Sequence, residues 1–193
     1  MSRRRSIAAG FLALGVLSAG LGACSSSNSG ASATTTTRPP SFAALVGAAN
    51  LLLRRGNLNA AEQLFSDAIS AEPKNAVGYF DLGVVYQREG LRLPALREYR
   101  LALRQNPRYV PAIYNKATLY GVFNPPLAIY FYRSVIALQP DSPTAWLNLG
   151  LLEAETKATL RPALKALKEA VRLEPSLRAR IPASLRAEMV TSN

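Results

Sequence analysis

The chain has 193 residues, and its 23 lysines and arginines against 12 aspartates and glutamates give a formal net charge of +11. It contains one cysteine and no histidine, so the sequence offers no imidazole ligand for zinc, copper or iron and no general base with a usual pKa near neutral pH. We therefore expect a non-catalytic protein without a metal or other cofactor.

The first thirty residues have the pattern of an export signal. Arg3, Arg4 and Arg5 precede an apolar run from Ile7 to Leu21 that is interrupted only by Ser18. This run is shorter than the roughly 20 residues needed to cross a hydrocarbon core. A basic start before a short apolar run is typical of a signal peptide.

The only cysteine follows this run directly. Leu21-Gly22-Ala23-Cys24 resembles the lipobox of bacterial lipoproteins, where the signal is removed just before a cysteine that carries diacylglyceryl on its sulfur. The resemblance implies a signal peptide at residues 1–23 and a lipid anchor on Cys24, which would hold the protein at a membrane of the bacterial cell envelope, outside the cytoplasm. A secretory signal with an incidental cysteine and an uncleaved membrane anchor are the alternatives.

Residues 24–41 are rich in serine, threonine and proline and are predicted to form a disordered tether. The 17 residues after the cysteine would span roughly 23 Å as a flexible chain. Thr34 to Thr37, beside Pro39, could accept O-glycans, although a plain solvated tether is the simpler interpretation. Without residues 1–23 the chain keeps 20 basic and 12 acidic residues, a net charge of +8. The part from Phe42 onward, about 150 residues, is a usual size for one domain.

An internal repeat begins after the tether. Four prolines recur at intervals of 34, 33 and 35 residues: Pro73, Pro107, Pro140 and Pro175. Alanine stands twelve residues before each proline, and a large side chain stands eight residues before each: Phe65, Tyr99, Tyr132 and Leu167. Each unit contains two stretches of helix length with apolar residues on one face, such as Leu82, Val85 and Tyr86.

These positions, with "YFDLGVVY" at 79–86 and "WLNLGLLE" at 146–153, resemble the tetratricopeptide repeat (TPR), W-x₂-L-G-x₂-Y, A-x₃-F and P at a period near 34 residues. The resemblance implies an all-α fold, a right-handed superhelix (α-solenoid) of four helix hairpins at residues 42–75, 76–109, 110–142 and 143–175. Residues 176–193 would form a C-terminal capping helix and tail, because the end of a repeat array needs a cover with a polar outer face.

The third and fourth units depart from the repeat pattern. Lys116 replaces the usual leucine, Ala117 replaces the glycine, and Glu153 stands where an aromatic residue is expected. Uncompensated charges are rarely buried. We consider two outcomes: Lys116 and Glu153 form an ion pair, or each extends to solvent independently.

In the TPR family the first helix of each hairpin lines a groove that receives an extended peptide or a partner helix. The family's groove positions fall here on ten residues: Asn50, Phe80, Asp81, Val84, Tyr114, Asn115, Thr118, Leu147, Asn148 and Leu151. The resemblance implies that the amides of Asn115 and Asn148 hydrogen-bond a peptide backbone, because an amide both donates and accepts. Alternatively, the apolar members are simply part of the core.

The carboxylate clamp with which some TPR proteins hold the C-terminal acid of a peptide is not reproduced. Val46 and Asp81 stand where a lysine and an asparagine would be needed. The remaining groove positions are mainly apolar and favour a hydrophobic peptide or an amphipathic helix as partner.

Basic residues gather on the second helices, where Arg97, Arg100 and Arg104 form a stripe. Such a stripe is usually solvated surface, but it could also make weak contact with anionic lipid or wall polymers. The sequence has no basic platform interleaved with aromatic residues, so we expect no nucleic-acid partner.

We therefore expect a membrane-anchored scaffold that binds other envelope proteins and supports assembly of an envelope complex. A more specific alternative is a pilotin-like lipoprotein for a pilus or secretion system, which is an analogy from architecture. An enzyme acting on the envelope is disfavoured, because the chain lacks histidine, a Ser-x-x-Lys motif and a phosphate-binding loop.

Overall fold

The computed structural model describes residues 39–156 and 160–191. The expected signal peptide, Cys24 and most of the expected tether therefore lie outside the described residues. The described part contains these helices: α1 (Phe42–Arg54), α2 (Leu58–Ala71), α3 (Ala76–Arg88), α4 (Arg92–Gln105), α5 (Val110–Gly121), α6 (Pro125–Leu138), α7 (Pro143–Glu155), α8 (Leu160–Leu173), the 3₁₀ helix η1 (Pro175–Arg180) and α9 (Ala183–Thr191).

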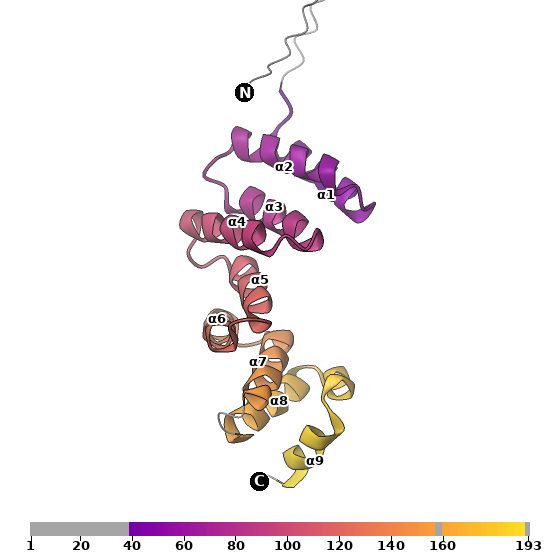
Figure 1. Cartoon of the computed structure of the whole chain (residues 1–193), viewed down its shortest axis with the longest axis vertical. Coiled ribbons are helices and arrows are strands. Elements are labelled where there is room, and N and C mark those ends of the chain that lie inside the picture. The colour runs from indigo at the N-terminus through magenta and orange to yellow at the C-terminus, as the bar shows by residue number, and fades with distance from the viewer. Residues whose placement is uncertain (1–38, 157–159, 192–193) are drawn as a thin grey trace, which may run out of the picture. The chain divides into compact units, whose positions relative to one another are not determined.

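The helices form four successive hairpins, α1–α2, α3–α4, α5–α6 and α7–α8 (Figure 1). Each helix packs most extensively on its partner in the hairpin, and the second helix of one hairpin packs on the first helix of the next. No strand occurs in the described residues, so the predicted all-α solenoid of four hairpins with a C-terminal cap is confirmed. None of the described helices is long and apolar enough to span a membrane.

Local sequence sets where the helices begin and end. Asn57 and Asn124 cap α2 and α6, each accepting a hydrogen bond from a backbone N–H three residues later. Gly56 and Gly90 end the first helices of two hairpins with φ of 79° and 78°, a conformation that glycine adopts without a steric penalty. Asparagine N-caps and glycine turns thus let the chain reverse direction between the two antiparallel helices of a hairpin.

The repeated small residues allow close packing inside each hairpin. The four alanines twelve residues before the prolines are fully buried: Ala61, Ala95, Ala128 and Ala163. A Cβ added to Gly83 would lie 2.6 Å from the Tyr99 ring, and one added to Gly150 would lie 2.7 Å from Leu167. The large side chain of the second helix therefore rests directly on the backbone of the first helix.

The C-terminal segment covers the last hairpin. Leu177 and Ile181, at η1 and just after it, and Met189 of α9 pack with Leu164 and Leu167 of α8 in one buried cluster. Without this cover, the apolar face that α8 presents to the end of the array would be exposed to water. The expected cap is thus present, as a 3₁₀ helix and a short α-helix.

Candidate functional site

The ten predicted groove residues lie on the first helices α1, α3, α5 and α7, and nine of them are at least partly exposed. Contacts across successive hairpins connect them. Asn50 on α1 hydrogen-bonds Asp81 on α3, and the Phe80 ring lies 5.4 Å from that of Tyr109, just before α5. Asn148 on α7 donates to the hydroxyl of Tyr114 on α5 at 2.8 Å. We call the nine exposed or partly exposed residues the first-helix face: Asn50, Phe80, Asp81, Val84, Tyr114, Asn115, Thr118, Asn148 and Leu151.

Leu147 has the core role that the sequence left open as the alternative. This side chain is fully buried and belongs to the cluster of α8, η1 and α9. Phe80 and Tyr114 occupy the equivalent positions in the two preceding hairpins and remain partly exposed. Leu147 differs because Leu177 and Ile181 of the C-terminal segment close over it, so it contributes to the core and not to a binding surface.

Phe80, Val84, Tyr114 and Leu151 are partly buried and also pack against core clusters. Each therefore combines the two roles that the sequence left open, because one side of the side chain supports the core while another reaches the surface. Thr118 is exposed and lies 3.2 Å from the hydroxyl of Tyr132. The first-helix face is thus a half-buried surface.

Two of the three amides of this face, those of Asn115 and Asn148, donate to tyrosine hydroxyls within the chain. Asn115 Nδ2 donates to the Tyr99 hydroxyl at 3.1 Å, and that hydroxyl donates to Gln87 Oε1 at 2.7 Å. Asn148 Nδ2 donates to the Tyr114 hydroxyl at 2.8 Å and to the Tyr132 hydroxyl at 3.3 Å. An amide has two N–H donors, so Asn148 uses both and keeps its carbonyl oxygen as the group that an incoming peptide N–H could reach.

The sequence analysis missed these tyrosine partners, although a signal was present. Tyr99 precedes Asn115 by 16 residues, and Tyr132 precedes Asn148 by 16 residues. In the first hairpin the equivalent residue is Phe65, which has no hydroxyl, and position 81 holds aspartate instead of asparagine. Tyrosine and asparagine thus occur together in the two places where the second helix of one hairpin is linked to the first helix of the next.

A hollow of about 260 Å³ opens beside the amide of Asn148. It is lined by residues of α5, α6 and α7: Thr118, Gly121, Tyr132, Asn148, Leu151, Leu152 and Glu155. Three of these residues belong to the first-helix face. The hollow therefore brings an apolar wall, hydroxyl groups and one carboxylate together around Asn148.

Asp81 supplies the one carboxyl group among the nine residues of the first-helix face. Burial raises its pKa from 3.8 to about 6, and the hydrogen bond from Asn50 opposes this rise. Burial also raises the pKa of Tyr99 to about 12, while the hydrogen bond from Asn115 lowers it and the negative charge of Asp81 raises it further. Of these two groups, only Asp81 therefore changes charge near neutral pH.

Lys116 and Glu153, the two charged residues that depart from the repeat pattern, contact different partners. Glu153 is buried and accepts a 2.6 Å hydrogen bond from the guanidinium of Arg133 on α6. Lys116 Nζ lies 4.4 Å from the centroid of the Phe131 ring. Both proposed outcomes are therefore wrong for Glu153, which neither pairs with Lys116 nor reaches solvent. Burial lowers the pKa of Lys116, and the nearby charge of Arg100 lowers it further.

The predicted arginine stripe on α4 is exposed, and one of its members is already paired. Arg97 Nε donates to Glu98 at 3.0 Å, and the Glu98 side chain is almost entirely buried. This pairing reduces the positive charge that the stripe presents, so α4 is a weaker candidate for an anion-binding surface than its sequence predicts.

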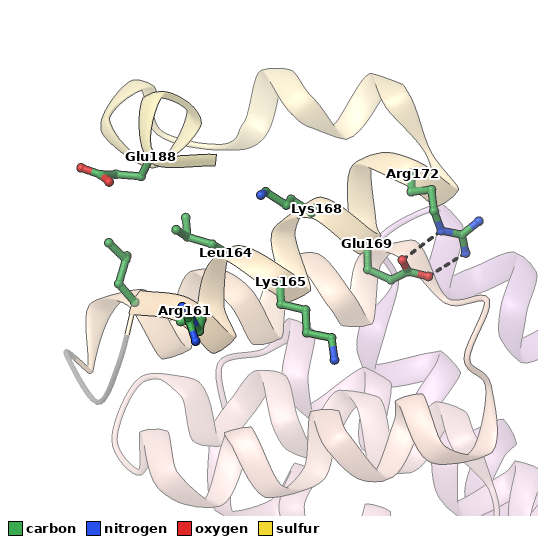
Figure 2. Close-up of a pocket in the computed structure, with 8 residues that line it drawn as sticks. Arg161, Leu164, Lys165, Lys168, Glu169, Arg172 and Glu188 are labelled. Carbon is green, nitrogen blue, oxygen red and sulfur yellow. Dashed lines mark hydrogen bonds and ion pairs between the residues drawn. The ribbon is translucent and has the colours of Figure 1, made fainter. Parts of the chain in front are cut away.

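A larger cleft that the sequence analysis did not identify lies between α8 and α9, and Figure 2 shows its lining residues. Its volume is about 840 Å³. Arg161, Lys165, Lys168 and Arg172 extend along one side of α8, with Leu164 between them and Glu188 opposite on α9. Arg172 forms an ion pair with Glu169 at 2.6 Å. The spacing of these four basic residues, at i, i+4, i+7 and i+11, could have predicted this basic face.

Within the described ranges, no group of three or more His, Cys, Asp or Glu side chains is arranged to hold a metal ion.

No family model matches the chain. The tetratricopeptide repeat and J domain-containing co-chaperone DNJ1 of Cryptococcus neoformans is 34% identical over 80 residues, which make up 42% of this chain and 15% of the co-chaperone. The chain spans between 8% and 18% of the length of the curated relatives that it matches.

Three solved structures cover between 61% and 72% of the chain. MamA matches 72% of this chain and 81% of its own, with a TM-score of 0.63 and 22% identity. YrrB, a TPR protein with an unusual peptide-binding site, matches 72% and 74%, with a TM-score of 0.60 and 22% identity. The first TPR of Spaghetti (RPAP3), bound to the HSP90 peptide SRMEEVD, matches 61% and 94%, with a TM-score of 0.58 and 19% identity. The chain therefore has the fold of a TPR-like α-solenoid.

Proposed function

We propose that this chain is a membrane-tethered, non-catalytic scaffold that binds a peptide or an amphipathic helix on its first-helix face. The supporting observation is the arrangement around Asn148, where tyrosine hydroxyls hold the amide beside a hollow of about 260 Å³. A side chain fixed in this way loses little conformational entropy when a ligand binds. Proteins of this fold that bind peptides include YrrB and the first TPR of Spaghetti.

The chemistry of the face indicates the kind of partner. Phe80, Val84, Tyr114 and Leu151 present apolar surface, and the carbonyl oxygen of Asn148 offers an acceptor for a backbone N–H. Asp81, with its raised pKa, would repel a peptide carboxylate at neutral pH. The partner is therefore a segment with apolar side chains on one side, and an acidic chain terminus is disfavoured.

The membrane part of the proposal is supported by sequence alone. Arg3 to Arg5, the apolar run and Cys24 favour lipid anchoring, which places the scaffold in the cell envelope, where it would support assembly of a larger complex. Mass spectrometry of the mature N-terminal peptide from the native host tests the anchor. A diacylglyceryl group on Cys24 supports it, and an unmodified cysteine or an intact N-terminus contradicts it.

Crosslinking in intact cells tests the binding face. The chain is crosslinked at its native level, and its adducts are compared with those of the variant Asn115→Ala/Asn148→Ala. We expect the dominant adduct to be lost. The matched control, Tyr99→Phe/Tyr132→Phe, removes links to the same two amides while keeping the amides at the surface.

The two variants separate binding from structure. Loss of the adduct in the asparagine variant and its retention in the tyrosine variant support direct contact with the amides. Equal loss in both variants means that the amides act only as links between hairpins. Retention of every adduct in both variants contradicts the proposed binding face.

A further inference from the structure

Exposed large apolar side chains gather at the turns inside the hairpins. Leu91 and Leu93 at the α3–α4 turn are 46% and 76% exposed, and Val122 and Phe123 at the α5–α6 turn are 80% and 45% exposed. The turns between hairpins, at residues 72–75, 106–109 and 139–142, contain no such side chain in the described part of the chain. Two turns on one edge of the solenoid, α3–α4 and α5–α6, are therefore apolar, whereas the three turns on the opposite edge are not.

The two apolar turns are in contact with each other. The guanidinium carbon of Arg92 lies 4.9 Å from the centroid of the Phe123 ring, in a cation–π arrangement. This contact brings the two turns together, and we call the five residues Leu91, Arg92, Leu93, Val122 and Phe123 the turn patch. Exposed apolar side chains that lie together mark a candidate interaction site.

Leu91 stands at the N-cap of α4, where its side chain cannot accept a capping hydrogen bond. Asn57 and Asn124, at the equivalent positions of the neighbouring hairpins, each cap a helix with their side chains. Leu91 is the N-cap of α4 and makes no side-chain cap. Because asparagine is favoured at an N-cap and leucine is strongly disfavoured there, fold stability does not explain the leucine. An exposed apolar side chain is instead suited to contact with a partner.

Both basic and acidic residues lie around the turn patch, and the exposed Glu155 lines the same hollow as Gly121, next to Val122. Arg54 and Arg55 are exposed at the α1–α2 turn. The guanidinium of Arg88, at the end of α3, donates to the carbonyl oxygen of Leu53 at 2.6 Å and so connects this turn to the second hairpin. Glu89 is the acidic residue of the α3–α4 turn. The positive charge next to the apolar side chains favours an anionic partner.

We propose that the turn patch docks on the surface of an anionic lipid bilayer. Leu93 and Val122 would enter the boundary between headgroups and acyl chains, while Arg92, Arg54 and Arg55 would lie among the phosphates. This inference rests on the proposed membrane tether and deepens it, because a tether of roughly 23 Å keeps the domain within reach of the bilayer. The edge would then lie on the membrane while the first-helix face stays available to a partner.

Vesicle flotation tests the inference independently of lipidation. Every core cluster is built from residues between Val46 and Met189, so residues 24–193 carrying Cys24→Ser retain the whole fold and the tether. We expect this chain to float with vesicles of phosphatidylglycerol and phosphatidylcholine, but not with phosphatidylcholine alone. Higher salt should weaken the binding.

Three variants identify the residues responsible. Leu93→Gln/Val122→Gln should weaken binding on the order of tenfold, whereas the control Val190→Gln, at an exposed valine of α9, should bind as the parent chain does. Arg54→Gln/Arg55→Gln should weaken it on the order of 30-fold, about fivefold for each charge. Leu91→Asn should raise the melting temperature and still weaken binding, a combination that excludes misfolding as the cause.

The inference is overturned if the parent chain binds the anionic vesicles no better than the neutral ones. It is also overturned if Val190→Gln weakens binding as much as Leu93→Gln/Val122→Gln does. If the chain ignores both kinds of vesicle and Leu93→Gln/Val122→Gln instead abolishes a dimer, the turn patch contacts protein and not lipid. Whether Cys24 carries a lipid is measured separately, from the mass of the Cys24 peptide.

Discussion

The guanidinium of Arg133 on α6 donates a 2.6 Å hydrogen bond to the carboxylate of Glu153 on α7. Glu153 is 5% exposed and stands where the preceding hairpins have Tyr86 and Tyr120. The pair therefore replaces an aromatic contact, and its arginine is largely in water while its carboxylate is buried. A buried carboxylate depends strongly on its partner, since removing one member of such a pair leaves an uncompensated charge.

Arg133→Met should lower the free energy of unfolding by about 1–3 kcal/mol, below the range for fully buried pairs because Arg133 itself is exposed. Adding Glu153→Phe should recover most of this loss, since an aromatic side chain fills the same position in other hairpins. Urea denaturation of the two variants provides the measurement. Equal stability of the single variant and the parent chain would show that Glu153 does not depend on Arg133.

Asp81 should make stability depend on pH. Its pKa is about 6 in the folded chain and 3.8 when exposed, so folding disfavours the charged form. The stability that this group contributes is fully present below about pH 4 and is lost as the pH rises through about 6. Asp81→Asn should therefore stabilise the fold at pH 7.5 by about 1–3 kcal/mol and change it much less at pH 4. Chemical denaturation at both pH values gives the comparison, and an identical gain at both would argue against a buried, titrating Asp81.

Gly150 should not tolerate a methyl group. A Cβ there would lie 2.7 Å from Leu167 Cγ and 2.9 Å from the carbonyl oxygen of Ala163, and backbone cannot yield as a side-chain tip can. We expect Gly150→Ala to destabilise the fold by about 1–3 kcal/mol despite the better helix propensity of alanine. The control is Gly47→Ala in α1, where nothing lies within 4 Å, and it should gain up to about 1 kcal/mol. Thermal unfolding of both variants checks the contrast, which fails if they shift in the same direction.

Tyr99→Phe should cost about 1–2 kcal/mol, because it removes the hydrogen bonds to Gln87 and from Asn115 within a buried site. The ring itself should fit, since Phe65 fills the same position in the first hairpin and is fully buried. Combining Tyr99→Phe with Asn115→Ala should cost less than the two single losses together, because both remove the same link. Strict additivity in a double-mutant cycle would show that the link carries no energy.

The buried alanines and the large side chain four residues after each are readable in the sequence. They recur because each hairpin repeats the same local contact, and this contact requires the same spacing between the two residues in every hairpin. The coupling of Tyr132 with Asn148 is also readable, at 16 residues, although only its repetition as Tyr99 and Asn115 reveals it. The partner of Glu153 could not be predicted from the sequence, because a contact that occurs only once produces no repeated spacing.

The sequence by itself determined the four hairpins, their caps and the residues that fill them, since these depend on periodicity and on helix propensity within about 35 residues. Only the tertiary structure decided that Leu147 belongs to the core, that Arg133 neutralises Glu153, and that two turns meet through Arg92 and Phe123. Each of these depends on which side chains meet when neighbouring hairpins and the C-terminal cap pack together. These contacts depend on the shape and charge of residues far apart in the sequence, and local sequence patterns carry no information about them.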